Sequence, residues 1–144
     1  MKDTTDRGNR RLIWLARIGL GLVFFLNIEC AFVFLAQPDR YAGSFELTGI
    51  TGRLVIQSFA ILFLMWNCTY PPVLLHPERH GTLFAIILAQ QLIGLTGETW
   101  LWLQIPTGHL VLSQSGLRFI LFDAAGFFMM SSVTLLFVRA RIWR

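Results

Sequence analysis

Four long runs of apolar residues dominate the sequence and limit what it can fold into. An α-helix needs about 20 residues to cross the hydrocarbon core of a bilayer, and the runs cover residues 12–36, 54–75, 82–105 and 117–138. Because 55% of the 144 residues are apolar, a soluble fold of this size would leave much apolar surface in water. We therefore predict an all-α membrane protein: one domain, residues 1–144, forming an up-down bundle of four transmembrane helices.

Proline-containing segments between the runs predict where the helices end. These segments are Gln37-Pro38-Asp39, His76-Pro77-Glu78 and Pro106-Thr107-Gly108. Within the second run, Tyr70-Pro71-Pro72 is expected to kink or terminate the helix. The connection over residues 37–53 is too long for a tight turn, and it fits either a short helix on the membrane surface or an ordered loop.

Basic residues predict the orientation of the bundle. The two terminal tails and the turn at residues 77–81 hold eight Lys or Arg residues, whereas the other side holds at most three, Arg40, Arg53 and Arg118. Since cytoplasmic loops are enriched in Lys and Arg, we expect both termini in the cytoplasm and the protein in the cytoplasmic membrane of a bacterium. The basic residues lie at membrane edges and form no stripe for nucleic acid.

Three acidic residues, Glu29, Glu98 and Asp123, fall inside the predicted spans. Carboxylates are costly at this depth, so they are expected to face the bundle interior or a wet cavity and to mark a functional site. Each lies six or seven residues from the outer end of its run, or about 10 Å along a helix. We therefore predict that the three form one layer of buried carboxylates.

Three amides form a second predicted layer nearer the middle of the membrane: Asn67, Gln90 and Gln91. Along the third run, Gln91, Gly94 and Glu98 follow the i, i+3, i+7 spacing of a single helix face. This face would connect the two layers and is expected to line a pocket.

A cation is expected near the acidic layer, because three ionised carboxylates in a low-dielectric site would repel each other. We predict that Arg118 pairs with at least one of them, with Arg53 as a second candidate. Asn27 lies about 160° around the first helix from Glu29, so only one of the two can face the interior. An equally open interpretation is that the polar residues only join the helices through hydrogen bonds.

The sequence contains no motif for a catalytic or metal site. His76, His80 and His109 lie outside the runs, so they are not placed to ligate haem within the bundle, and phosphate-binding loops and the usual hydrolase motifs are missing. Cys30 and Cys68 lie at different depths and do not suggest a disulfide. We predict no catalytic residue, no metal and no cofactor, apart from a bound lipid or quinone.

Part of the sequence resembles the DoxX-like family of membrane proteins. The resemblance covers residues 17–64: RIGLGLVFFLNIECAFVFL, then Pro38, Tyr41 and Phe45, then the step Gly49-Ile50-Thr51-Gly52. It implies a four-helix membrane fold. The family includes a small subunit associated with thiosulfate:quinone oxidoreduction, and no catalytic residue transfers from the resemblance.

Three functions remain in competition. The first is an accessory subunit of a membrane complex, such as a redox complex, or a module that binds a lipid-like or quinone-like molecule. Its partners would be other membrane subunits or further copies of the chain in the bilayer. The second is a small proton-coupled transporter that uses the carboxylates as a relay. The third is an intramembrane enzyme that uses Glu98 or Asp123 as an acid or base.

Overall fold

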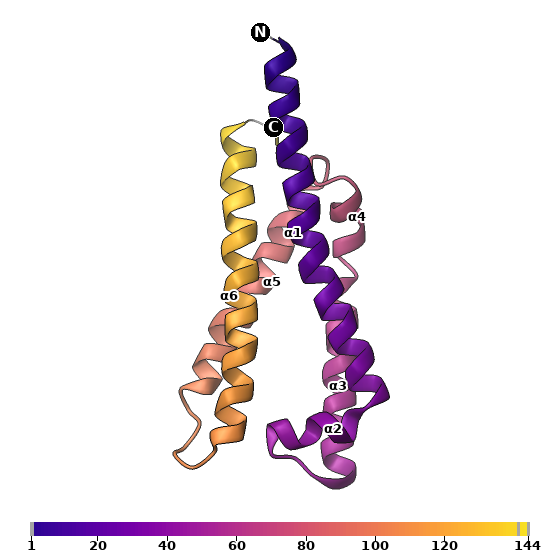
Figure 1. The fold of residues 1–144 in the computed structure, drawn as a ribbon, viewed down its shortest axis with the longest axis vertical. Helices are drawn as coiled ribbons and strands as arrows, with labels where there is room; N and C mark the ends of the chain where they lie inside the picture. The colour runs from indigo at the N-terminus through magenta and orange to yellow at the C-terminus, as the bar shows by residue number, and fades with distance from the viewer. Residues whose placement is uncertain (1, 141, 144) are drawn as a thin grey trace.

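The computed structural model describes residues 2–140, 142 and 143, and this part of the chain is helical without strands (Figure 1). Seven helical segments follow each other along the chain: α1 (Lys2–Ala36), α2 (Pro38–Ala42), the 3-10 helix η1 (Gly43–Phe45), α3 (Gly49–Asn67), α4 (Tyr70–Leu75), α5 (Gly81–Trp102) and α6 (Leu110–Arg139).

Four of the helices are long and apolar enough to cross a membrane. The candidate spans are Gly8–Ala36, Gly49–Asn67, Gly81–Trp102 and Leu110–Arg139. Large apolar side chains point outward along all four, for example Ile18, Ile61, Ile93 and Phe128, as expected for surfaces that contact lipid. The prediction of an all-α protein with four helices that can span a membrane is confirmed for the described residues.

Several helix boundaries differ from the predicted ones, and α1 and α3 begin ten and five residues earlier than predicted, at Lys2 and Gly49. The second predicted run, residues 54–75, is two helices, because α3 ends at Asn67 and α4 begins at Tyr70 with prolines in its first turn. Proline provides no backbone N–H and clashes with the preceding turn, so Pro71 and Pro72 end α3 and start a new helix. In addition, α6 begins at Leu110, seven residues before the predicted start.

The connection between the first two spans contains short helices, so the helical alternative is the correct one. Pro38 occupies the first turn of α2, where its missing N–H is not needed. The segment then turns through η1 and ends at Glu46, which has a positive φ of 55°. Arg53 in the first turn of α3 holds this connection through an ion pair with Asp39 at 2.6 Å.

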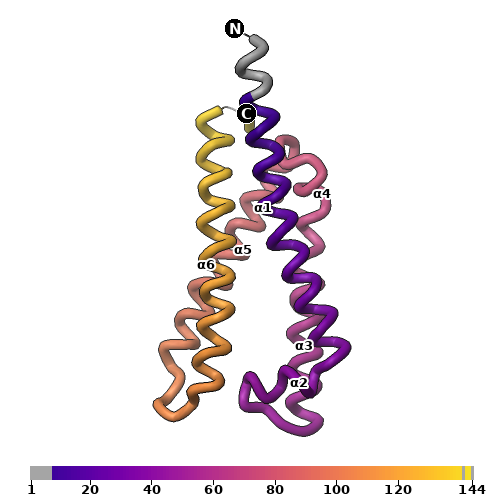
Figure 2. Tube along the Cα trace, in the orientation of Figure 1, coloured from indigo at the N-terminus to yellow at the C-terminus, as the bar shows by residue number. Residues whose placement is uncertain are grey.

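The long helices form two pairs, α1 with α3 and α5 with α6. Figures 1 and 2 show the pairs close together at the end where α1 begins and α6 finishes, and spread apart towards the other end. We call this other end the distal end; it consists of α2, η1 and the turn at residues 103–109. At the distal end η1 packs against α6 and connects the two pairs.

The two buried apolar clusters differ in what they join. One, which includes Leu20, Tyr70, Phe84 and Met130, joins both helix pairs and α4. Trp143 packs against this cluster, and its Nε1 donates a hydrogen bond to the carbonyl oxygen of Pro77 at 2.9 Å. The other cluster lies in the distal half and is built from α1, α2 and α3, so the two pairs are less tightly packed there.

Candidate functional site

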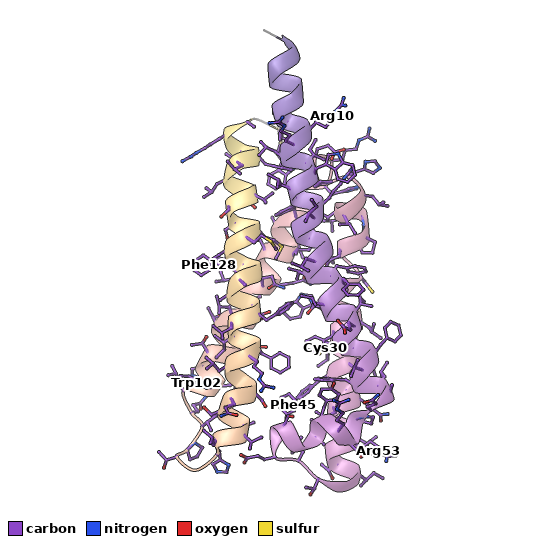
Figure 3. The ribbon with its side chains drawn as sticks, viewed as in Figure 1. Arg10, Cys30, Phe45, Arg53, Trp102 and Phe128 are labelled. Atoms are coloured by element: carbon purple, nitrogen blue, oxygen red, sulfur yellow. The ribbon has the colours of Figure 1, made fainter. Side chains whose placement is uncertain are left out.

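A cavity of about 350 Å³ lies between the two helix pairs, on the distal side of the tightly packed cluster. Every spanning helix contributes to it, and α2 and η1 add Tyr41, Ser44 and Phe45. Figure 3 shows Cys30 of α1 and Phe45 of η1 at the space between the pairs. The lining residues of the spanning helices are Leu26, Asn27, Cys30, Phe34, Phe63, Trp66, Gln91, Gly94, Glu98, Ser115, Arg118, Phe119, Phe122 and Asp123.

One wall of the cavity is polar and comes from α5 and α6. Gln91, Gly94 and Glu98 all line it, so the predicted i, i+3, i+7 face of α5 does point into a pocket. Asp123 of α6 lies directly against the backbone of α5, since a Cβ atom added at Gly94 would be 2.1 Å from its Oδ2. Glycine at position 94 is therefore what allows the Asp123 carboxyl to reach this wall.

Several polar atoms of this wall lack a hydrogen-bond partner among the described residues. They are Oε1 of Gln91, Oε2 of Glu98 and Nε1 of Trp66, all buried. The other end of the Gln91 side chain is engaged, because its Nε2 donates to the hydroxyl of Tyr70 at 3.2 Å. Since buried polar groups are nearly always paired, these atoms indicate a place for a ligand or water.

The rest of the cavity lining is largely aromatic, and a second cavity of about 480 Å³ adjoins it. The two cavities share six lining residues: Phe34, Phe45, Phe63, Trp66, Glu98 and Phe119. Phe119 stacks on Phe63 with 6.4 Å between the ring centroids and lies 5.9 Å from the ring of Phe45. The aromatic side chains thus line both cavities, whereas most of the polar side chains line only the first.

The distal end of the cavity is tied to α6 by Glu46, which the sequence did not single out. Its carboxyl group contacts Nδ1 of His109 and accepts a hydrogen bond from the backbone N–H of Leu112 at 3.4 Å, in the first turn of α6. The hydrogen bond with His109 is the main reason that the pKa of Glu46 is lowered. This contact holds η1, and with it Phe45, over the cavity.

The predicted acidic layer is only partly present. Glu98 and Asp123 line the same cavity, but both are half-buried, so the described residues do not support the prediction of buried carboxylates. Glu29 is exposed on the outside of α1, whereas Asn27 is buried and faces the cavity. Because of the way α1 is rotated about its own axis, the amide of Asn27 lines the cavity where the carboxylate of Glu29 was expected.

The predicted ion pair with Arg118 is not formed. Arg118 lines the cavity, yet among the described residues no ion pair of 4.0 Å or less joins it to a carboxylate. Arg53, the second candidate, pairs with Asp39 outside the cavity. The polar wall is therefore not closed by an internal cation.

The other two predicted amides, Asn67 and Gln90, are not among the cavity residues. Asn67 is 2% exposed and donates to the carbonyl oxygen of Phe63 in its own helix at 2.7 Å. Gln90 accepts a hydrogen bond from the hydroxyl of Thr69 at 3.4 Å. The contact between Thr69 and Gln90 joins α5 to the break between α3 and α4, which is the structural role that the sequence left open, whereas the bond of Asn67 stays within α3.

The sequence matches no family model, no curated protein and no solved structure.

Proposed function

We propose that this protein binds an amphiphilic small molecule, lipid-like or quinone-like, in the space between its two helix pairs. One observation carries the proposal: buried oxygens without a partner among the described residues lie beside aromatic side chains in two adjoining cavities. Cavities of about 300–1,000 Å³ with apolar walls and a few polar groups are typical of ligand sites. A head group would contact Gln91, Glu98 and Asp123, and an apolar tail would lie among the Phe side chains.

The proposal includes the orientation and family of the chain. The excess of Lys and Arg near the termini supports a cytoplasmic location for both ends, which would put the distal end and its cavity in the outer half of a bacterial cytoplasmic membrane. The resemblance to DoxX-like proteins over residues 17–64 is compatible with a small quinone-linked or lipid-linked subunit.

A pair of native cysteines allows a direct test. Cys30 is half-buried and lines the cavity, whereas Cys68 is exposed at the end of α3. Native mass spectrometry of protein released from membranes should detect a bound amphiphile on the wild type. Cys30→Trp, which fills the cavity, should lose it, while Cys68→Trp, the matched control, should keep it. A wild type without any amphiphile, or equal retention by the two folded variants, would refute the proposal.

A second candidate function, an accessory subunit in a larger membrane complex, is favoured by the outer face of α1. Ile18, Leu22, Phe25, Glu29 and Phe32 recur every three or four residues, and all are exposed. A carboxylate on a lipid-facing helix surface is costly unless another protein supplies a partner for it. A photo-crosslinking residue at Phe25 should therefore capture a second membrane protein, whereas one at Phe128 on α6 should not. Equal capture at both positions would exclude α1 as a specific interface.

A further inference from the structure

The buried atoms of the cavity residues that have no hydrogen-bond partner among the described residues are mainly acceptors. Gln91 is 1% exposed, and because its Nε2 already donates to Tyr70, its Oε1 is the atom that has no partner. Oε2 of Glu98 is a second buried acceptor without a partner among the described residues. Asp123 adds a third oxygen-bearing side chain, held against α5 at Gly94.

This acceptor character does not depend on whether the carboxyl groups are charged. An ionised carboxylate only accepts hydrogen bonds, and a protonated one gains an O–H donor but keeps acceptor lone pairs. Donors also line the same space: Trp66 has one buried indole N–H, and Arg118 is exposed and is not paired with either carboxylate. Further N–H or O–H groups belong to the polar side chains of Asn27, Tyr41, Ser44 and Ser115. A ligand that supplies donors would pair with the buried acceptors, and one that supplies only acceptors would leave them unpaired.

We infer that the cavity selects amphiphiles whose head group donates hydrogen bonds, either a primary ammonium or hydroxyl groups, over heads that cannot donate. This inference rests on the proposed function and specifies its ligand. The reason for the selectivity is that a site built to pair with donors rejects an analogue that lacks them, since its buried acceptors then stay unpaired.

Three single-chain probes with the same tail separate donor capacity from charge. Dodecylammonium carries a charge and three N–H donors, dodecyltrimethylammonium carries the same charge without donors, and 1-O-dodecylglycerol carries two hydroxyl donors without charge. The measured quantity is the probe concentration in the vesicle membrane that halves the rate of Cys30 alkylation, with Cys68 alkylation as the internal control.

Both donor-bearing probes should protect Cys30 at membrane concentrations at least about tenfold lower than the trimethylammonium probe. If the glycerol ether alone shows this preference, hydroxyl-bearing heads are the ligand class, and if the ammonium probe alone shows it, primary amines are. Equal protection by all three probes would overturn the inference and leave the proposed function intact. Protection by none of them would overturn both.

Two neighbouring glutamines provide matched variants for the same assay. Gln91→Leu removes the unpartnered acceptor and should reduce the preference for donor-bearing probes by about tenfold or less, whereas Gln90→Leu, outside the cavity, should leave the preference unchanged. If Gln91→Leu does not fold, Glu98→Ala serves in its place. An unchanged preference in the folded cavity variant would contradict the role of these acceptors.

Discussion

The contact between Gly94 and Asp123 leads to a prediction that a single methyl group can test. In Gly94→Ala, the new Cβ would lie 2.1 Å from Oδ2 and 3.2 Å from Cγ of Asp123, and 3.5 Å from Cη2 of Trp66. The carboxyl group must move by more than about 1 Å to reach an ordinary van der Waals separation. Because Trp66 borders the same space, the movement also alters the polar wall.

The expected cost follows from a comparison with Gly97 on the same helix. A Cβ at Gly97 would meet nothing within 4 Å, so Gly97→Ala gains the same intrinsic helix preference without the clash. Overpacking in a well-packed site costs about 1–3 kcal/mol, and the low end of this range applies here because the clashing atom is the end of a side chain that borders a cavity. We therefore expect Gly94→Ala to be about 1 kcal/mol less stable than Gly97→Ala, since the helix preference cancels between them.

Reversible unfolding in mixed micelles, followed by circular dichroism, measures this difference, and native mass spectrometry measures amphiphile retention in the same samples. Gly94→Ala should lose stability and retain less ligand, and Gly97→Ala should match or exceed the wild type in both. Equal stability and retention in the two variants would show that Asp123 is not held against α5, and the description of the polar wall would then be wrong.

Two further predictions concern the ends of the bundle. His109 lowers the pKa of Glu46 below its ordinary value of 4.5. The stabilisation from this carboxylate is therefore complete well above pH 4.5 and is lost as the pH falls through the lower pKa of the folded state. Glu46→Gln should remove this acid-dependent loss of stability from unfolding curves, and an unchanged pH dependence would exclude the contact. At the other end, Trp143 packs against Phe84 and Phe137 with centroids 5.2 Å and 5.1 Å away. Trp143→Ala should cost about 3 kcal/mol, whereas Trp143→Phe, which loses the bond to Pro77 but keeps one aromatic ring, should cost about 1 kcal/mol. Equal costs in unfolding experiments would refute a packing role.

Hydropathy and helical spacing predicted much of this architecture from sequence. The four spans follow from apolar runs of sufficient length, and the α3–α4 break from Tyr70-Pro71-Pro72. The polar face of α5 follows from the spacing of Gln91, Gly94 and Glu98, because residues at i, i+3 and i+7 share a face in any regular helix. These features depend on local chemistry alone.

Features that depend on tertiary arrangement were not predictable in this way. Glu29 and Asn27 are both polar and two residues apart, so only the packing of α1 against its neighbours decides which faces inward. The contact of Glu46 with His109 joins residues 63 positions apart, and no local pattern marks it. The position of Phe45 over the cavity depends on that same contact.

The most direct test of the ligand-binding account is an experimentally determined density map of the protein in lipid nanodiscs. The account predicts elongated density in the space between the helix pairs, with its head within hydrogen-bond distance of Glu98 and its tail against the aromatic side chains of Phe63 and Phe119. Helix pairs that close on each other along their whole length, or a space that holds only separate water molecules, would contradict it.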